Sequence, residues 1–459
     1  MNETPIHAAN LPTQVQPRLR RVLSLWDLIL YGIVLIMPIA PVPLFGVAQK
    51  LSLGHGVTTI LIAMVAMVLT AFSYGRMAAL YPSAGSAYTY VGRGLNPHLG
   101  FLAGWAMFLD YLLVPLICTI YGALTVHRLV PEVPYAVWAG LFAGAMTFIN
   151  LRGIRTTTGA NLVFCAVMCG VVIWFIVLAV RFLFAHQGWH GLLSGQPFYN
   201  PQTFHLSAIA TATSVAALTY GGFDGVTTLA EDVKNPRRNV LLATVFVCLF
   251  TGIFGGLQIY LAQRVWPDYT TFPNLETAFL DVSRIVGGVL LFNAMAATLI
   301  IANLGAGLSA QAAVSRLLFG MGRDGVLPRR VFAYLDPKRN TPVYNIWLVG
   351  VLAFAGALVL NYERAAELIN FGAFLAFMGV NAATIRQFHF GKIEGRTPGL
   401  VKDVIVPAAG FVFCLAIWLS LATPAKIAGA VWFLVGITYA AVITRGFRLK
   451  PVPIDFAES

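Results

Sequence analysis

Long apolar stretches, separated by short polar connections, run along almost the whole chain. A window of about 19 residues detects them, and most approach the ~20 residues that cross ~30 Å of hydrocarbon as a helix. The pattern predicts an all-α membrane protein with twelve transmembrane helices. The expected spans are 24–48, 56–80, 97–127, 134–151, 159–184, 206–230, 239–263, 285–318, 343–361, 365–388, 403–421 and 425–445.

The composition excludes an ordinary soluble protein. Of the 459 residues, 58% are hydrophobic and only 10% are charged, whereas soluble domains carry about 25% charged residues. All five cysteines lie inside apolar stretches, and neither CxxC nor HExxH occurs, so we expect no disulfide scaffold and no metal or other cofactor. No nucleophile or acid/base constellation indicates an enzyme, and a channel would need a continuous polar stripe that no span shows.

Basic residues predict the orientation of the chain in the membrane. With a cytoplasmic N-terminus, 23 of the 30 lysines and arginines face one side and seven face the other. This asymmetry follows the positive-inside rule, so we expect both termini in the cytoplasm, as a disordered segment 1–17 and a tail 446–459. The rule also accounts for the net charge of +12 without a nucleic-acid partner.

The first span contains three prolines in the run IMPIAPVPLFG: Pro38, Pro41 and Pro43. Each proline lacks an N–H and clashes with the preceding turn, so this run cannot form a continuous helix. At membrane depth, freed backbone groups are tolerated only inside protein or beside water. We therefore expect a helix break that offers carbonyl oxygens but few N–H donors, which favours an ammonium ligand. The expected break residues are Met37, Pro38, Ile39 and Ala40.

A second break is expected in the sixth span, where glycines surround Asp224 in the run LTYGGFDGVTTLAE. Interrupted helices at corresponding positions of two halves are typical of inverted-repeat transporters with a midplane site. Packing kinks are the alternative, because proline and glycine are common in membrane helices. Four residues of this break are expected at the substrate, with the two aromatic ones either closing over it or only packing: Tyr220, Gly221, Gly222 and Phe223.

Few acidic residues lie at membrane depth, where an ionisable group is a functional-site hypothesis by default. Asp110 lies about 13 residues into the third span, and no lysine or arginine shares the depth of Asp110 or Asp224. A substrate ammonium or a proton is the expected partner of Asp224, against a hydrogen bond to freed backbone. Asp110 with Tyr111 either binds substrate or forms an interhelical pair. Glu231 either couples to protons or forms a surface salt bridge.

Three segments give the chain a resemblance to the amino acid/polyamine/organocation permeases. They are PSAGSAYTYVGRGLNPHLGFLAGW (82–105), GFDGVTTLAEDVKNPRRNV (222–240) and SRLLFGMGRDGVLPRRVFAYLDPKRNTP (315–342). Within that superfamily RLRRVLSLWDL, LDYLLVP, VPEVPYAVW and LINFGAFLAF are most similar to bacterial putrescine importers. The resemblance implies two inverted five-helix repeats, 18–185 and 206–388, with two peripheral helices in 403–445. It also implies alternating access in the inner membrane, and an acidic residue at the position of Asp224 that serves substrate or proton.

Three positions depart from the family pattern. PIAPVP replaces the usual glycine-rich break that holds a carboxylate, which disfavours a standard α-amino acid. Pro43 stands where putrescine importers have an aspartate, which disfavours a diamine, and Met168 stands where many proton-coupled relatives have a lysine. We expect a monomeric or homodimeric importer of a putrescine-like amine, driven by protons or membrane potential. The alternative is a proton-coupled amino acid permease or an exchanger.

Overall fold

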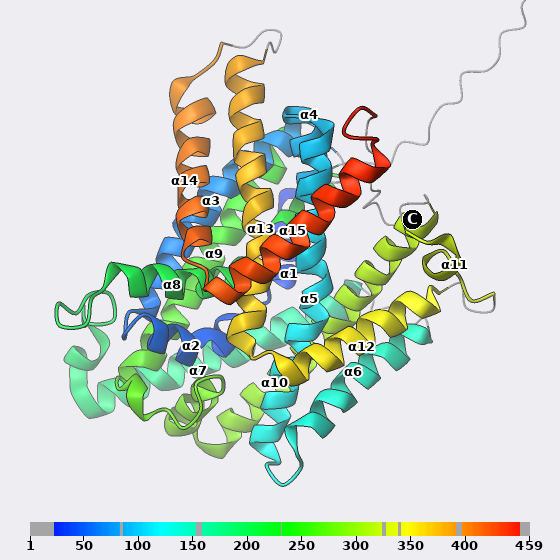
Figure 1. Cartoon of the computed structure of the whole chain (residues 1–459). Helices are drawn as coiled ribbons and strands as arrows, with labels where there is room; N and C mark the ends of the chain where they lie inside the picture. Colours follow the sequence, from blue (N-terminus) through cyan, green and yellow to red (C-terminus); the bar gives the residue numbers. More distant parts are fainter. Residues whose placement is uncertain are drawn as a thin grey trace, which may run out of the picture.

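The computed structural model describes residues 23–82, 86–152, 158–230, 232–323, 327–337, 341–391 and 397–449. Within these ranges the chain is almost entirely helical (Figure 1). The α-helices are α1 (Leu25–Ile36), α2 (Pro41–Leu51), α3 (Gly56–Leu80), α4 (Ser86–Gly94), α5 (Pro97–Leu129), α6 (Tyr135–Leu151), α7 (Thr158–Leu192), α8 (Leu206–Ala216), α9 (Pro236–Val265), α10 (Ala278–Arg323), α11 (Arg329–Phe332), α12 (Val343–Val359), α13 (Tyr362–Ile385), α14 (Val406–Leu419) and α15 (Thr423–Ile443).

Shorter turns of other helix types connect or extend these elements. Three are 3₁₀-helices, η1 (Ala217–Tyr220), η2 (Phe223–Leu229) and η3 (Tyr269–Thr271), and two are π-helices, η4 (Arg386–Phe390) and η5 (Val401–Ile405). Such turns are often found at functional sites and at helix ends. Here η1 and η2 follow α8 directly and lie within the predicted sixth span.

Each of the twelve predicted segments is helical, which confirms the all-α fold class. By length and composition, nine helices in the described ranges can cross a membrane, or ten if α1 and α2 form one bent span. The apolar helices α6 and α12 have 17 residues each. The eighth predicted span, 285–318, lies within α10, which begins at Ala278 and bends at Gly288, where φ is 65°.

Local capping explains where several helices begin. Ser24 and Asp27 form a reciprocal capping box at the start of α1: the Ser24 N–H donates to Asp27 Oδ2 at 2.8 Å. At α13 the Asn361 side chain accepts the Arg364 N–H at 3.0 Å. Side chains of this kind satisfy N–H groups that have no partner within the helix. Asp27 is therefore a structural residue, although it is acidic and lies at the beginning of the first span.

Small residues allow the central helices to approach closely. A Cβ added at Gly75 of α3 would lie 2.5 Å from the Leu241 Cα of α9, and one at Gly252 of α9 would overlap the Met64 side chain of α3. Close backbone approach at small residues is the usual way in which membrane helices associate. Helix α5 packs against both α10 and α13, so it occupies the centre of the bundle.

Apolar side chains also cover the outside of the bundle. Exposed examples include Val359 at the end of α12 and Val431, Leu434 and Val442 on α15. A soluble monomer exposes few contiguous apolar patches, whereas lipid-facing helix surfaces are apolar by necessity. Together with the long apolar helices, this surface identifies a multi-pass membrane protein.

Candidate functional site

The first predicted helix break is present. Helices α1 and α2 are bent by 58° across residues 37–40. Met37 has a positive φ of 60°, and Pro41 is the first residue of α2. Proline is favoured at a first helical position because the N–H that it lacks has no intrahelical acceptor there. The proline-rich run thus ends one helix and begins another within the same span.

The second predicted break is also present, and it is built from 3₁₀ turns. After α8 ends at Ala216, the Gly221 N–H donates to Leu218 O at 2.9 Å, and the Gly225 N–H donates to Gly222 O at 3.0 Å. Gly222 has a φ of +99°, a conformation that costs little only for glycine. Asp224 follows this left-handed residue, within η2.

The end of α1, just before the first break, touches the second break. A Cβ added at Gly222 would lie 3.3 Å from Leu35 O, and one at Gly225 would lie 2.7 Å from Leu35 Cδ1. The last turn of α1 therefore packs directly on the η1–η2 segment. The chain just before α1 also contacts the chain just after η2. There the Leu23 N–H donates to Asp232 O at 3.0 Å, and the Lys234 N–H donates to Leu23 O at 2.9 Å. We call this pair of main-chain hydrogen bonds the Leu23 clasp.

A cavity beside the second break brings the two intramembrane aspartates together. It is lined by residues of α3, α5, the η1–η2 segment and α13. Asp110 from the middle of α5 and Asp224 from η2 both line it. Four further lining residues matter below: Tyr220, Gly221, Gly222 and Asn370.

Neither aspartate has a neutralising partner among the described residues. Asp224 is 5% exposed, and its Oδ2 has no hydrogen-bond partner in the part of the chain that the structure describes. Among the residues that the structure describes, no lysine or arginine lines the cavity, and neither aspartate forms an ion pair. A buried charge without a partner costs several kcal/mol. Chemically, an arrangement of this kind can accept a proton or a cation.

Of the three aromatic residues predicted near the substrate, one lines the cavity and two do not. Tyr220 lines the cavity, and its hydroxyl donates to Ile60 O at 2.8 Å. Phe223 does not line it: its ring packs against Tyr74 and Phe377, with centroids 5.5 and 5.2 Å away. Tyr111 is half-buried among apolar side chains and also lies outside the cavity lining.

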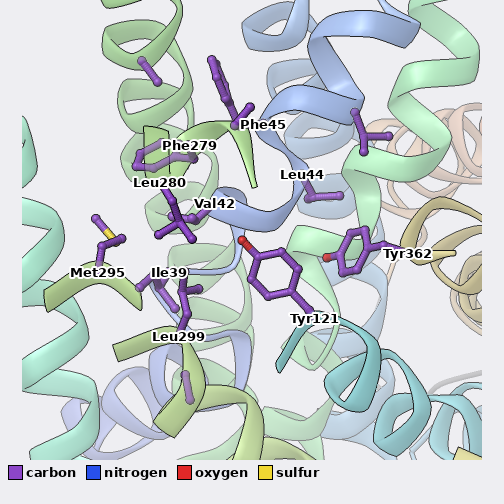
Figure 2. Packing of buried hydrophobic residues seen from close by; sticks show 14 of the residues in the cluster. Ile39, Val42, Leu44, Phe45, Tyr121, Phe279, Leu280, Met295, Leu299 and Tyr362 are labelled. Atoms are coloured by element: carbon purple, nitrogen blue, oxygen red, sulfur yellow. The ribbon is translucent and has the colours of Figure 1, made fainter. Parts of the chain in front are cut away.

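The first break lies apart from the cavity of the carboxylates. Met37 and Pro38 line a second, smaller cavity against α9. The Pro38 carbonyl accepts a hydrogen bond from Gln258 Nε2 at 3.0 Å. Ile39 points into the apolar core near Leu299 (Figure 2), and Ala40 is the half-buried residue before α2. Glu231, the proposed proton-coupling residue, lies outside the described residues.

Sequence reasoning did not identify the contribution of α13 to the cavity. Ile369, Asn370, Ala373, Phe374 and Phe377 all line it, as does Met67 of α3. Their spans were predicted, but most of these side chains are apolar and the helices are buried on several sides, so no periodicity marks the face toward the cavity. Of these lining residues, only Asn370 is polar, and an amide in an apolar span was the one feature of the sequence that could have indicated this contribution of α13.

A family model described as amino acid permease matches residues 28–441. The chain belongs to the amino acid permease family. This membership, which confirms the resemblance to the amino acid/polyamine/organocation superfamily, makes the protein a transporter and not an enzyme.

Named relatives cover nearly the whole permease. It is 32% identical over 454 residues to the low-affinity putrescine importer PlaP of Escherichia coli (strain K12), covering 96% of this chain and 97% of the relative. It is 27% identical to the methylthioribose transporter of Bacillus subtilis (strain 168), with coverage of 91% and 92%. The branched-chain amino acid permease BcaP of the same organism is 25% identical, with coverage of 94% and 95%.

Proposed function

We propose that this permease imports a small organic amine, with a putrescine-like diamine as the first candidate. The observation that carries this proposal is the pairing of Asp110 and Asp224 in one cavity whose described lining contains no lysine or arginine. Two carboxylates match two ammonium groups or one ammonium and one proton. The 32% identity to a putrescine importer over almost the entire chain supports the same substrate class.

Membrane potential favours such a substrate. A charge that enters a negative-inside cell gains about 2.3 kcal/mol per 100 mV. A diamine with two charges therefore gains about 4.6 kcal/mol, or roughly a thousandfold accumulation at 1.4 kcal/mol per decade. A zwitterionic amino acid has no net charge and gains nothing from the potential. For such a substrate the permease would need a co-transported proton, with Asp224 and Glu231 as the proposed carriers.

The proposed transport cycle is alternating access in a twelve-span inner-membrane protein. The first five spans, within 18–185, and the next five, within 206–388, form inverted repeats, and 403–445 contributes two peripheral helices. Support comes from the two interrupted helices, five spans apart, that touch at Leu35 and Gly222. The asymmetry of basic residues supports cytoplasmic termini. We propose a monomer or a homodimer in the bilayer.

A proton-coupled amino acid permease or an exchanger is the second candidate. It is favoured by the relation to the branched-chain amino acid permease BcaP, which aligns over 94% of this chain. In that case the aspartates would hold the α-amino group, and backbone N–H groups at the Gly221–Gly222 break would have to hold the carboxylate. The two candidates are separable by substrate and by driving force, because a proton-coupled permease takes up leucine in response to a pH gradient, whereas potential drives a diamine without any proton.

Uptake by purified protein in proteoliposomes tests this proposal. Labelled putrescine, butylamine, arginine and leucine are offered under a potassium-diffusion potential and, separately, under a pH gradient. We expect putrescine uptake that rises with inside-negative potential, and its loss in Asp224→Asn. The matched control Asp268→Asn changes an exposed aspartate in the loop between α9 and α10 and should transport normally. Leucine uptake driven only by the pH gradient, with no putrescine uptake, would overturn the amine proposal.

A further inference from the structure

Asn370 is the single neutral amide that lines the cavity among the described residues. It lies on α13, is only 4% exposed, and its neighbours on the same helix face are apolar. Burying an amide costs free energy unless its donors and acceptors are satisfied. The hydrogen-bond partners of the Asn370 amide therefore indicate which of its two polar atoms is satisfied by the protein.

One half of the amide is already bound. Asn370 Nδ2 donates to the Ser214 carbonyl oxygen at 2.6 Å. Rotating the amide would place two oxygen atoms at that distance with no hydrogen between them, so the nitrogen must face Ser214. Ser214 belongs to the last turn of α8, where carbonyl groups lack the N–H of a following α-helical turn. Asn370 thus supplies a donor to the broken helix from a different span.

The other half of the amide is free for a ligand. Oδ1 has no hydrogen-bond partner among the described residues, and the residue lines the same cavity as Asp110 and Asp224. A primary ammonium group has three N–H donors. The cavity offers two carboxylates and this one amide oxygen, which adds an acceptor without adding a third negative charge.

We propose that Asn370 binds the substrate through Oδ1, as the third acceptor for a primary ammonium group, and thereby selects primary amines over N-alkylated ones. This inference rests on the proposed function, because it names a residue that sets the substrate preference of the same site. Alkylation replaces N–H donors with methyl groups, which cannot donate to an oxygen. The hydrogen bond to Ser214 fixes the amide, so the oxygen is held in place before the substrate arrives.

The expected consequence is a change in selectivity. Asn370→Leu has a similar volume but neither donor nor acceptor. Hydrogen bonds to charged groups contribute about 1.5–3 kcal/mol, so the KM for putrescine should rise about 10- to 100-fold. The KM for N,N,N′,N′-tetramethylputrescine should change little. Asn370→Asp keeps an oxygen in the cavity but loses the donor to Ser214, so it should lower thermal stability and keep the preference for putrescine.

Asn381 provides a matched control on the same helix. Its Nδ2 donates to Thr70 Oγ1 at 3.1 Å, it is fully buried, and it does not line the cavity. Asn381→Leu should lower stability and leave the ratio of the two KM values unchanged. If Asn370→Leu is not recovered folded, Asn370→Ala withdraws the same oxygen and must give the same change of ratio.

The outcomes separate the two proposals. If the wild-type protein transports neither diamine, the proposed function fails and the role of Asn370 fails with it. If the wild type prefers putrescine, and Asn370→Leu or Asn370→Ala is less stable but keeps the same KM ratio, Asn370 is only structural and this inference is overturned. A loss of preference in these variants that Asn381→Leu does not share supports it.

Discussion

Replacing Gly222 with alanine tests whether the second helix break is required. Gly222 has a φ of +99°, a conformation in which a residue with a Cβ is strained by roughly 1–3 kcal/mol. The added Cβ would also lie 3.3 Å from Leu35 O and 3.5 Å from Leu35 Cβ. The α1 backbone would therefore have to move away by a few tenths of an ångström. We expect Gly222→Ala to destabilise the fold by about 1–3 kcal/mol and to reduce uptake, because Gly222 lines the cavity.

Thermal unfolding in detergent and initial uptake rates in proteoliposomes measure these two effects. Gly144 on α6 is the matched control, since it is exposed and a Cβ there meets nothing within 4 Å. Gly144→Ala should be neutral or stabilising by about 0.5–1 kcal/mol, the difference in helix propensity. A Gly222→Ala protein with wild-type melting temperature and uptake would refute the claim that this position needs a left-handed residue.

Three further substitutions test other parts of the molecule. Asp110→Asn should raise the KM for putrescine about 10- to 100-fold. It should raise the KM for butylamine by a smaller factor, because the monoamine has only one charge to bind. Equal effects on both KM values in uptake assays would exclude Asp110 as a second ammonium ligand. Arg76→Ala should destabilise the protein by about 3–5 kcal/mol, because it removes one member of a buried ion pair, the guanidinium that contacts the carboxylate of Asp403. Unchanged thermal unfolding would contradict this. His55→Phe should cost about 1–3 kcal/mol, because the Asn200 N–H loses its acceptor, His55 Nε2, at 3.0 Å, and the melting temperature measures this loss.

The helix breaks could be predicted because their causes are local. Pro38 and Pro41 cannot join a continuous helix whatever surrounds them, and glycines beside Asp224 permit the backbone conformation that the structure shows at Gly222. The burial of Asp224 followed from its depth in an apolar span. These conclusions needed only the covalent chemistry of neighbouring residues and the thickness of a bilayer.

The ligands of the site could not be assigned in the same way. The Pro38 carbonyl was expected to face the substrate, but in the structure it accepts a hydrogen bond from Gln258, 220 positions away. Phe223 adjoins Asp224 in sequence, yet its ring packs against other aromatic side chains. Asn370 faces the cavity from a distant helix. Each placement depends on how non-neighbouring helices pack, and hydropathy carries no information on that.

The Leu23 clasp has a practical consequence for mutagenesis. Both of its hydrogen bonds join main-chain atoms, between Leu23 and the residues on either side of Val233. Replacing these side chains with alanine keeps every N–H and C=O, so systematic alanine scanning would leave the clasp intact and score these positions as unimportant. Only proline at position 23 or 234 deletes a donor. The connection between the two interrupted helices is thus made by main-chain atoms alone, so it can persist when the side chains at these positions change during evolution.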